Sequence, residues 1–233
     1  MGCCSNGRLG KGRGCAEELA LCRQEEALGF GNTAVEKAVE ALQRSCSQEG
    51  TMNDNQFRSF ASQLSLNLTD LDTVDSNKCA FYSHFRATKG YDPHKLGILS
   101  VLLCRGSEEA KAAALFQHCP GESRDLVQDT GLQALLTFIF DLCVDLLPAL
   151  AQTEAPRTGE GLSEAELRAY QSKLRVPRAQ VWRRVYVALI LTNRTLAKAD
   201  FISRLLNHKD ARRVTSPSSL REMLSQEPVL AKI

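Results

Sequence analysis

The feature that most constrains the fold is a recurring unit in which two helical segments flank a short link with one apolar residue. Three or four mostly polar residues follow this residue, and then comes the apolar residue that opens the next helix. The lone apolar residues are 39, 35, 36 and 34 residues apart, which is typical of repeated helical units. They are Met52, Tyr91, Leu126, Leu162 and Leu196. The sequence therefore predicts an all-α chain.

Helix start signals accompany these units. Thr33 to Glu36 and Ser163 to Glu166 both fit the capping-box pattern and precede apolar residues at helical spacing. Asp92-Pro93 provides a cap followed by proline at the first helical position. Val181 to Leu191 reads as an apolar helix, and Ser219 is expected to cap a last short helix.

The stretch from Phe81 to Phe116 carries a resemblance to a known family. Its runs Gly90-Tyr91-Asp92-Pro93-His94-Lys95-Leu96, Leu99-Ser100-Val101 and Arg105 to Glu109 resemble the second-to-third hand segment of the neuronal calcium sensor and calcineurin B group. The resemblance covers roughly residues 33 to 175, by pattern more than by identity. It implies EF-hand-like pairs, in which the lone apolar residues of two neighbouring loops pair through a small two-stranded link.

The resemblance implies a division of the chain into four parts. A flexible, acylated tether is expected first, then two EF-hand-like pairs, and finally an additional C-terminal helical segment that either packs in the groove or binds a partner. The expected ranges are 1–32, 33–106, 107–176 and 177–233.

The expected loops have lost most of the oxygen ligands that calcium requires. An EF-hand loop binds calcium through oxygens at positions 1, 3, 5, 7, 9 and 12, with a glycine at position 6. Counting from Tyr91 at position 8 places His84 first, Arg86 third and Lys95 twelfth. The loops around Leu126, Leu162 and Leu196 also lack the necessary carboxylates, so these four loops are not expected to hold a dication.

Only the first loop keeps oxygen-bearing side chains at most ligand positions, together with Gly50. A single carboxylate makes any calcium binding there very weak, so we expect no metal and no cofactor. The candidate ligands are Ser45, Ser47, Glu49, Asn53 and Gln56.

The first fourteen residues predict a lipid anchor. Gly2 is a candidate for myristoylation once Met1 is removed, and a single myristoyl chain binds membranes only marginally, so a second signal is needed. Palmitoylation of Cys3 or Cys4 would supply it, although Asn6 departs from the preferred Ser or Thr. Basic residues would add attraction to anionic lipids: Arg8, Lys11 and Arg13.

Composition and charge limit the other functions. A formal charge of +2 and 6% aromatic residues argue against nucleic-acid binding. The longest apolar stretch, 132–151, is nearly long enough to span a bilayer. Because Asp141 and Asp145 lie on one face of it, we expect a buried amphipathic helix instead.

No catalytic motif is recognisable, and we expect no enzyme. The sequence favours a calcium-independent adaptor that is lipid-anchored at the cytoplasmic face of a membrane and binds an amphipathic helix of a partner protein. The alternative is a weak calcium sensor that uses the loop from Ser45 to Gln56. A third possibility is an interaction domain of a larger complex in which the N-terminal tail matters little.

Overall fold

The computed structural model describes residues 15–46, 51–66, 76–120, 125–153, 162–190 and 195–228, and this part of the chain is mostly helical. The all-α prediction is therefore confirmed. In the first half of the chain the elements are α1 (Ala16–Ala27), η1 (Phe30–Asn32), α2 (Val35–Ser45), α3 (Asp54–Gln63), α4 (Asn77–Ser83), β1 (Arg86–Ala87), β2 (Gly90–Tyr91), α5 (Pro93–Leu103) and α6 (Glu108–Gln117).

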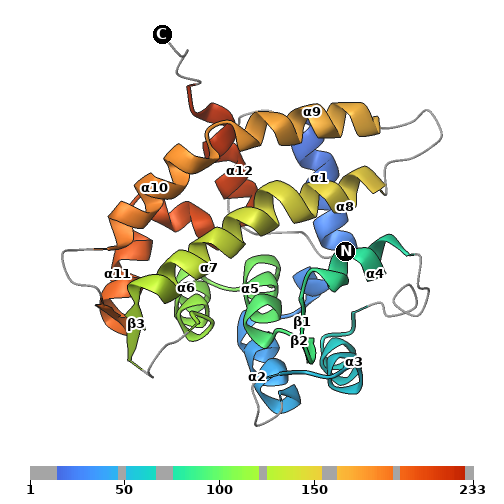
Figure 1. Cartoon of the computed structure of the whole chain (residues 1–233), viewed down its shortest axis with the longest axis vertical. Helices are drawn as coiled ribbons and strands as arrows, with labels where there is room; N and C mark the ends of the chain where they lie inside the picture. Colours follow the sequence, from blue (N-terminus) through green and yellow to red (C-terminus); the bar gives the residue numbers. More distant parts are fainter. Residues whose placement is uncertain are drawn as a thin grey trace.

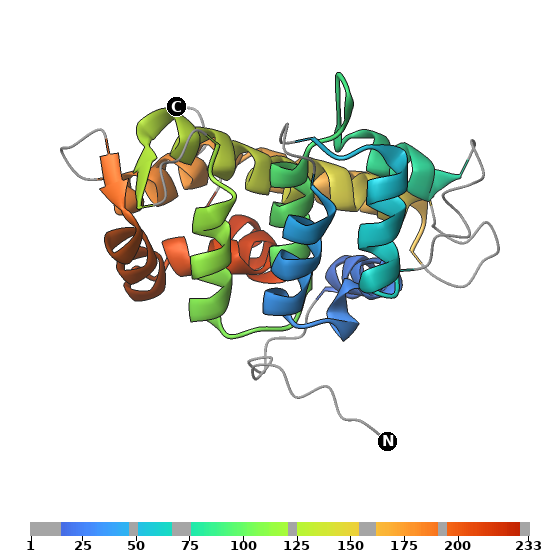
Figure 2. The same cartoon turned by 90° about the horizontal axis from the view of Figure 1, so that it is seen from below.

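The second half begins with β3 and ends with α12. Its elements are β3 (Leu126–Gln128), α7 (Asp129–Asp141), the π-helical turn η3 (Leu142–Leu146), α8 (Leu147–Thr153), α9 (Glu164–Arg175), α10 (Arg178–Leu189), β4 (Thr195–Ala197), α11 (Lys198–Asn207), the 3-10 helix η4 (Ala211–Thr215) and α12 (Pro217–Gln226). Figure 2 shows α6, α5, α2 and α3 standing next to one another.

The links before α3 and α5 pair with each other through backbone hydrogen bonds. Met52 N donates to the Tyr91 carbonyl at 3.1 Å, and Tyr91 N donates to the Met52 carbonyl at 2.6 Å. Gly90 has a φ of 122°, and a Cβ on it would lie 2.4 Å from the Met52 carbonyl oxygen, so this close approach requires glycine. Two of the lone apolar residues predicted from the sequence thus meet.

A second pairing joins β3 to β4, so that α6 and α7 are linked to α10 and α11. The strands are antiparallel, and Val127 is opposite Leu196. Val127 is 1% exposed whereas Leu126 is 44% exposed, so the buried link residue lies one position later than expected. Leu162 lies in no strand and directly precedes Ser163, the N-cap of α9. The division into 107–176 and 177–233 stays a prediction, and the β3–β4 pairing crosses that boundary.

Residues 129–153 form one helical segment through α7, η3 and α8. In Figure 1 it runs between α9 and α10 on one side and α4, α5 and α6 on the other. Pro148 cannot donate a backbone hydrogen bond and would clash with the carbonyl four residues earlier in a regular helix. The wider turn of η3, in which Leu147 N donates to the Leu142 carbonyl, accommodates this proline.

Within the described residues this is the one helix that is long and apolar enough to cross a membrane by length and composition. Of its most apolar window, 61% is buried inside the fold. Leu136, Ile139 and Phe140 are fully buried, and the helix supplies a large share of the core. It lies where a buried core helix was expected.

Of the helix caps predicted from the sequence, some are confirmed and others are wrong. Asp92-Pro93 caps and opens α5, and Ser163–Glu166 forms the reciprocal capping box of α9. Ser219, in contrast, lies inside α12, which begins at Pro217. The last short helix does form, and its apolar side chains are buried: Leu220, Met223 and Leu224.

The capping box expected over Thr33–Glu36 is wrong. No side chain caps α2, and the Val35 N–H instead donates to the Arg105 carbonyl at 2.7 Å. The Thr33 hydroxyl donates to the Leu64 carbonyl at 3.3 Å. A carbonyl that follows α5 therefore satisfies the helix start in place of the expected side chain.

The two ends of the described chain are joined by a buried ion cluster. Arg221 of α12 is 0% exposed and donates from Nε and Nη2 to both carboxylate oxygens of Glu18, at 2.9 and 2.7 Å. Its Nη1 lies 2.7 Å from Glu25 Oε1, and the Tyr170 hydroxyl of α9 donates to Glu18 at 2.9 Å. Burial raises the pKa of Glu25, and Arg221 opposes this effect. The cluster therefore holds α1, α9 and α12 together.

We expect Arg221→Met to lower the free energy of unfolding by about 3–5 kcal/mol, because Glu18 and Glu25 would remain buried without their cation. Urea denaturation of the purified chain measures this change. Arg44→Met is the matched control, because Arg44 is 72% exposed and pairs with Glu40 within α2; its effect should stay below about 1 kcal/mol. Equally small effects in both variants would show that the cluster is not structural.

Candidate functional site

In the first candidate calcium loop, the described side-chain oxygens already accept hydrogen bonds from other groups of the protein. Asn53 Oδ1 accepts from Gln56 N at 2.9 Å, and Gln56 Oε1 accepts from Asn53 N at 2.8 Å, which makes a capping box at the start of α3. Ser45 is buried, and its Oγ accepts from Gln63 Nε2 at 3.3 Å. Ser47 and Glu49 lie outside the described residues.

In the link that pairs with it, Arg86 binds a carboxylate of the protein. Arg86 was counted at the third loop position, and its Nη2 lies 2.7 Å from Asp54 Oδ1. Its guanidinium also lies 4.7 Å from the centre of the Tyr91 ring. Because both charges are about half exposed or more, the pair contributes little stability. It does place the positive charge of Arg86 beside Asp54, a carboxylate close to the paired links.

The acidic residue that opens α7 beside β3 is also engaged. The Tyr186 hydroxyl of α10 donates to Asp129, and Gln133 Nε2 donates to the same carboxylate at 3.1 Å. The Asp125 carbonyl accepts from Lys198 N at 3.0 Å. In the part of the chain that the structure describes, no three His, Cys, Asp or Glu side chains are arranged to hold a metal ion.

The candidate lipidation residues and their basic neighbours lie outside the described residues. These are Gly2, Cys3, Cys4, Arg8, Lys11 and Arg13.

His118 is a buried histidine that packs between α5 and α6. It is packed over Gly97 of α5, and its Nε2 has no hydrogen-bond partner. Burial, with a smaller effect of nearby His94, lowers the pKa of His118 to about 4, so the ring is neutral at neutral pH. The adjacent Cys119 Sγ donates to the Leu115 carbonyl. Both side chains belong to the packing between α5 and α6.

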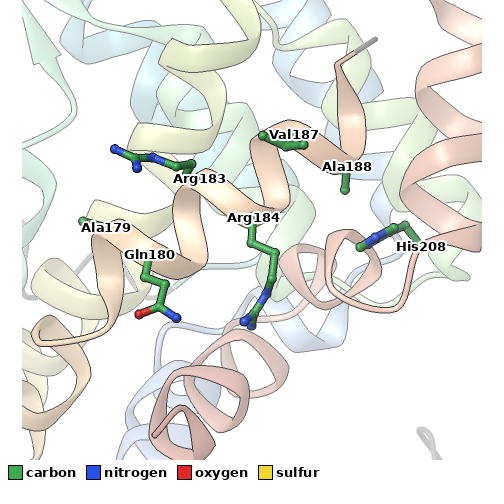
Figure 3. Close-up of a pocket in the computed structure, with 7 residues that line it drawn as sticks. All are labelled: Ala179, Gln180, Arg183, Arg184, Val187, Ala188 and His208. Carbon is green, nitrogen blue, oxygen red and sulfur yellow. The ribbon is translucent and has the colours of Figure 1, made fainter. Parts of the chain in front are cut away.

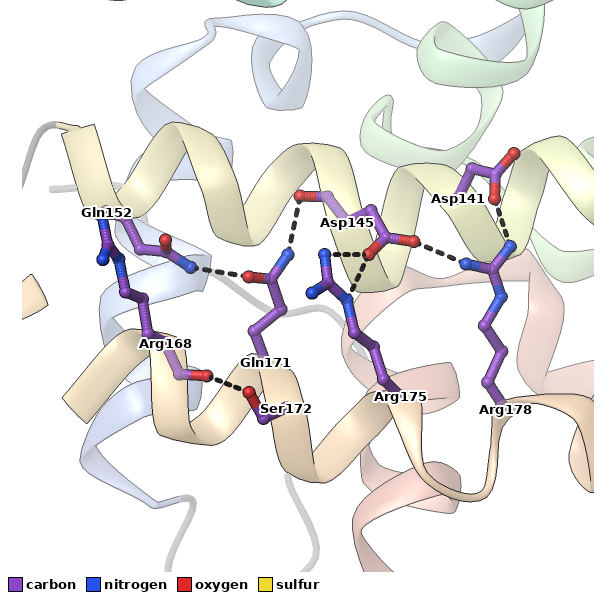
Figure 4. Close-up of polar contacts among 8 residues, drawn as sticks. All are labelled: Asp141, Asp145, Gln152, Arg168, Gln171, Ser172, Arg175 and Arg178. Atoms are coloured by element: carbon purple, nitrogen blue, oxygen red, sulfur yellow. Dashed lines mark hydrogen bonds and ion pairs between the residues drawn. The ribbon is translucent and has the colours of Figure 1, made fainter. Parts of the chain in front are cut away.

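An ion network on the long helix positions α9 and α10, as Figure 4 shows. Arg178 bridges Asp141 and Asp145, and Arg175 binds Asp145 at 2.7 Å. Gln171 Nε2 donates to the Asp145 carbonyl at 3.2 Å. The sequence placed the two aspartates on one face, but it did not identify their cations. A signal was available, because two carboxylates on an apolar helix require cations, and the sequence has Arg175 and Arg178, which end α9 and open α10.

This network leaves one face of α10 open to solvent. Val176, just before the helix, and Val187 are each 62% exposed. A depression of about 810 Å³ lies along this face (Figure 3). Its lining residues are Ala179, Gln180, Arg183, Arg184, Val187, Ala188 and His208.

The two arginines that line the depression differ in their partners. Arg184 binds Glu227 at 2.9 Å and Asp210 at 2.8 Å, and Gln180 donates to Glu227 at 3.0 Å. Arg183 is exposed and has no ion-pair or hydrogen-bond partner among the described residues. This face therefore combines apolar side chains with one free cation, a combination that the sequence did not reveal.

No family model, no curated protein and no solved structure matches this chain.

If His118 is a packing residue, Gly97→Ala should destabilise the fold, because the new Cβ would lie 2.3–2.5 Å from the ring atoms. We expect a net loss of roughly 1–2 kcal/mol, since overpacking exceeds the gain in helix propensity. Gly31→Ala, with nothing within 4 Å, is the control and should be nearly neutral. Added to a His118→Ala chain, Gly97→Ala should cause no further loss of stability, because the clashing ring is gone. A further loss in that background would show that the cause lies elsewhere.

Proposed function

We propose that the chain is a lipid-anchored, calcium-independent adaptor at the cytoplasmic face of a membrane, built from two EF-hand-like pairs, that binds a helical segment of a partner protein. The finer fold assignment is supported by the two link pairings. Met52 pairs with Tyr91 and Val127 with Leu196, and in each case the paired links join two sets of helices.

The main observation in favour of calcium independence is the capping box at the start of α3. Asn53 and Gln56 would have to turn their side-chain oxygens toward a cation, and both oxygens already accept backbone N–H groups of the helix start. Breaking such a cap costs about 1 kcal/mol, which a loop with a single carboxylate offsets poorly. Arg86 beside Asp54 further disfavours a dication at the paired links.

The alternative, a weak calcium sensor, requires that cap to open when calcium binds. Ser45 would also have to leave its buried position. The described contacts therefore favour the adaptor.

The proposed partner does not take the place of the last helix, α12, which packs into the fold. η4 packs against α6, α10 and α11, and α12 packs against η3 and α9. The apolar side chains of α12 are buried there, and Arg221 fixes the helix to α1. A partner helix therefore binds an outer surface of the folded chain.

Gly2→Ala tests the anchor in cells. The variant should move from the membrane fraction to the soluble fraction, because no myristoyl chain can be attached, and cell fractionation with metabolic myristate labelling measures this. Cys3→Ser with Cys4→Ser should leave a labelled but weakly bound protein, because one chain gives a binding constant of only about 10⁴ M⁻¹.

Gly7→Ala is the matched control, a glycine in the same stretch that carries no proposed acyl chain. It should stay in the membrane fraction. Continued membrane residence of Gly2→Ala would rule out the acyl anchor and favour an interaction domain that needs no lipid.

A further inference from the structure

We infer that the exposed face of α10 is the docking surface for an acidic amphipathic helix of the partner protein. The inference rests on the adaptor function proposed above and specifies where and what the adaptor binds. This face, called the α10 stripe below, consists of Val176, which directly follows α9, and of Ala179, Arg183 and Val187 on α10.

The α10 stripe has the spacing of one helix face. Its members follow one another by three, four and four residues, so the three on α10 lie along one side of that helix. Within α10 the stripe runs from Ala179 to Val187, about 12 Å along a helix that rises 1.5 Å per residue, and exposed Val176 lies just before the helix. Such a stripe matches two to three turns of a partner helix whose contacting residues recur at similar intervals.

The depression extends the α10 stripe toward the corner between α11 and η4. Figure 3 shows Gln180 and Arg184 extending to one side of α10, toward the side of His208, and Arg183 extending to another. His208 Nδ1 accepts from Asp210 N at 3.3 Å, so the hydrogen of the neutral ring is on Nε2. That N–H is a donor beside the depression.

The charge of the surface selects an acidic partner. Of the two arginines that line the depression, Arg184 is bound to Glu227 and Asp210, whereas Arg183 has no anion partner among the described residues. A carboxylate of the partner would pair with Arg183 and receive a charge-assisted hydrogen bond. The valines would bury the apolar residues of the same partner helix.

A second copy of this chain fits the α10 stripe less well. In an antiparallel two-fold pairing that sets Val176 against Val187, the helices would cross near Trp182. The two Arg183 residues would then lie about 5 Å apart along the axis, without a carboxylate between them. Like charges at such a distance repel, and the partner has to supply the anion.

A lipid surface is also disfavoured as the occupant. One basic side chain near an anionic membrane contributes about 1 kcal/mol, too little to hold a protein. The expected partner segment is therefore a helix of about twelve residues with a carboxylate in the middle and apolar residues near both ends.

The test is a selection from a displayed library of randomised helical peptides of about twelve residues against the purified full-length chain. Enriched peptides should carry Asp or Glu centrally and large apolar residues near their ends. Arg183→Glu should weaken their binding by about tenfold or more, and Val187→Asp should weaken it similarly.

Arg23→Glu is the matched control, because Arg23 is an exposed arginine on α1, outside the α10 stripe. It should change binding by less than about twofold. Enriched peptides that are not acidic, or acidic peptides that bind the Arg183→Glu chain equally well, would overturn the inference.

Two further measurements test whether a second copy of the chain or a lipid surface occupies the α10 stripe instead. Sedimentation that shows a dimer broken by Val187→Asp would assign the surface to a second copy. Binding to phosphatidylserine vesicles that is lost in Arg183→Glu would assign it to lipid, and either result overturns the inference. Peptides that bind the chain but ignore both substitutions would leave the adaptor function standing and refute only the α10 stripe.

Discussion

The buried pairing of Arg221 with Glu18 and Glu25 is the interaction on which the arrangement of the helices depends. An arginine without solvent contact is tolerated only where carboxylates face it, so α12 can dock only where α1 supplies both anions. This pairing fixes the last helix over the apolar side chains of the second half of the fold. It also joins the helix that follows the proposed acyl tether to the end of the chain. The surfaces left for a partner are then external, and among them α10 combines exposed apolar residues with a free cation.

The links before α3 and α5 are paired through backbone hydrogen bonds. Met52 and Tyr91 exchange two such bonds, and stacking of Phe57 on Tyr91, with ring centres 4.1 Å apart, packs the pair against the core. Around them, Asn53 and Gln56 cap α3, and Arg86 pairs with Asp54. In the adaptor that we propose, packing and backbone pairing take the place of metal coordination, and we expect the fold to have one state with or without calcium.

The sequence predicted what local chemistry determines. Asp92 and Ser163 cap their helices because their partners lie two or three residues away, and Met52 and Tyr91 have the spacing of link residues. It failed where distant segments compete: the Arg105 carbonyl replaces the expected cap at Thr33, and Leu162 belongs to no strand. The Arg221 cluster joins residues 203 positions apart, and no local pattern indicates such a contact. For the same reason the α10 stripe emerged only with the three-dimensional fold, whereas the lipidation sites and part of the first loop stay predictions.

Hydrogen exchange of the link amides tests most directly whether the scaffold is ordered without a metal. The amides of Met52, Tyr91, Val127 and Leu196 would be followed in the full-length chain, once with EDTA and once in millimolar calcium. Equal and strong protection in both solutions is the expected result, because the hydrogen bonds of the links need no cation. Protection that appears only with calcium would contradict the proposed calcium independence and identify the chain as a sensor.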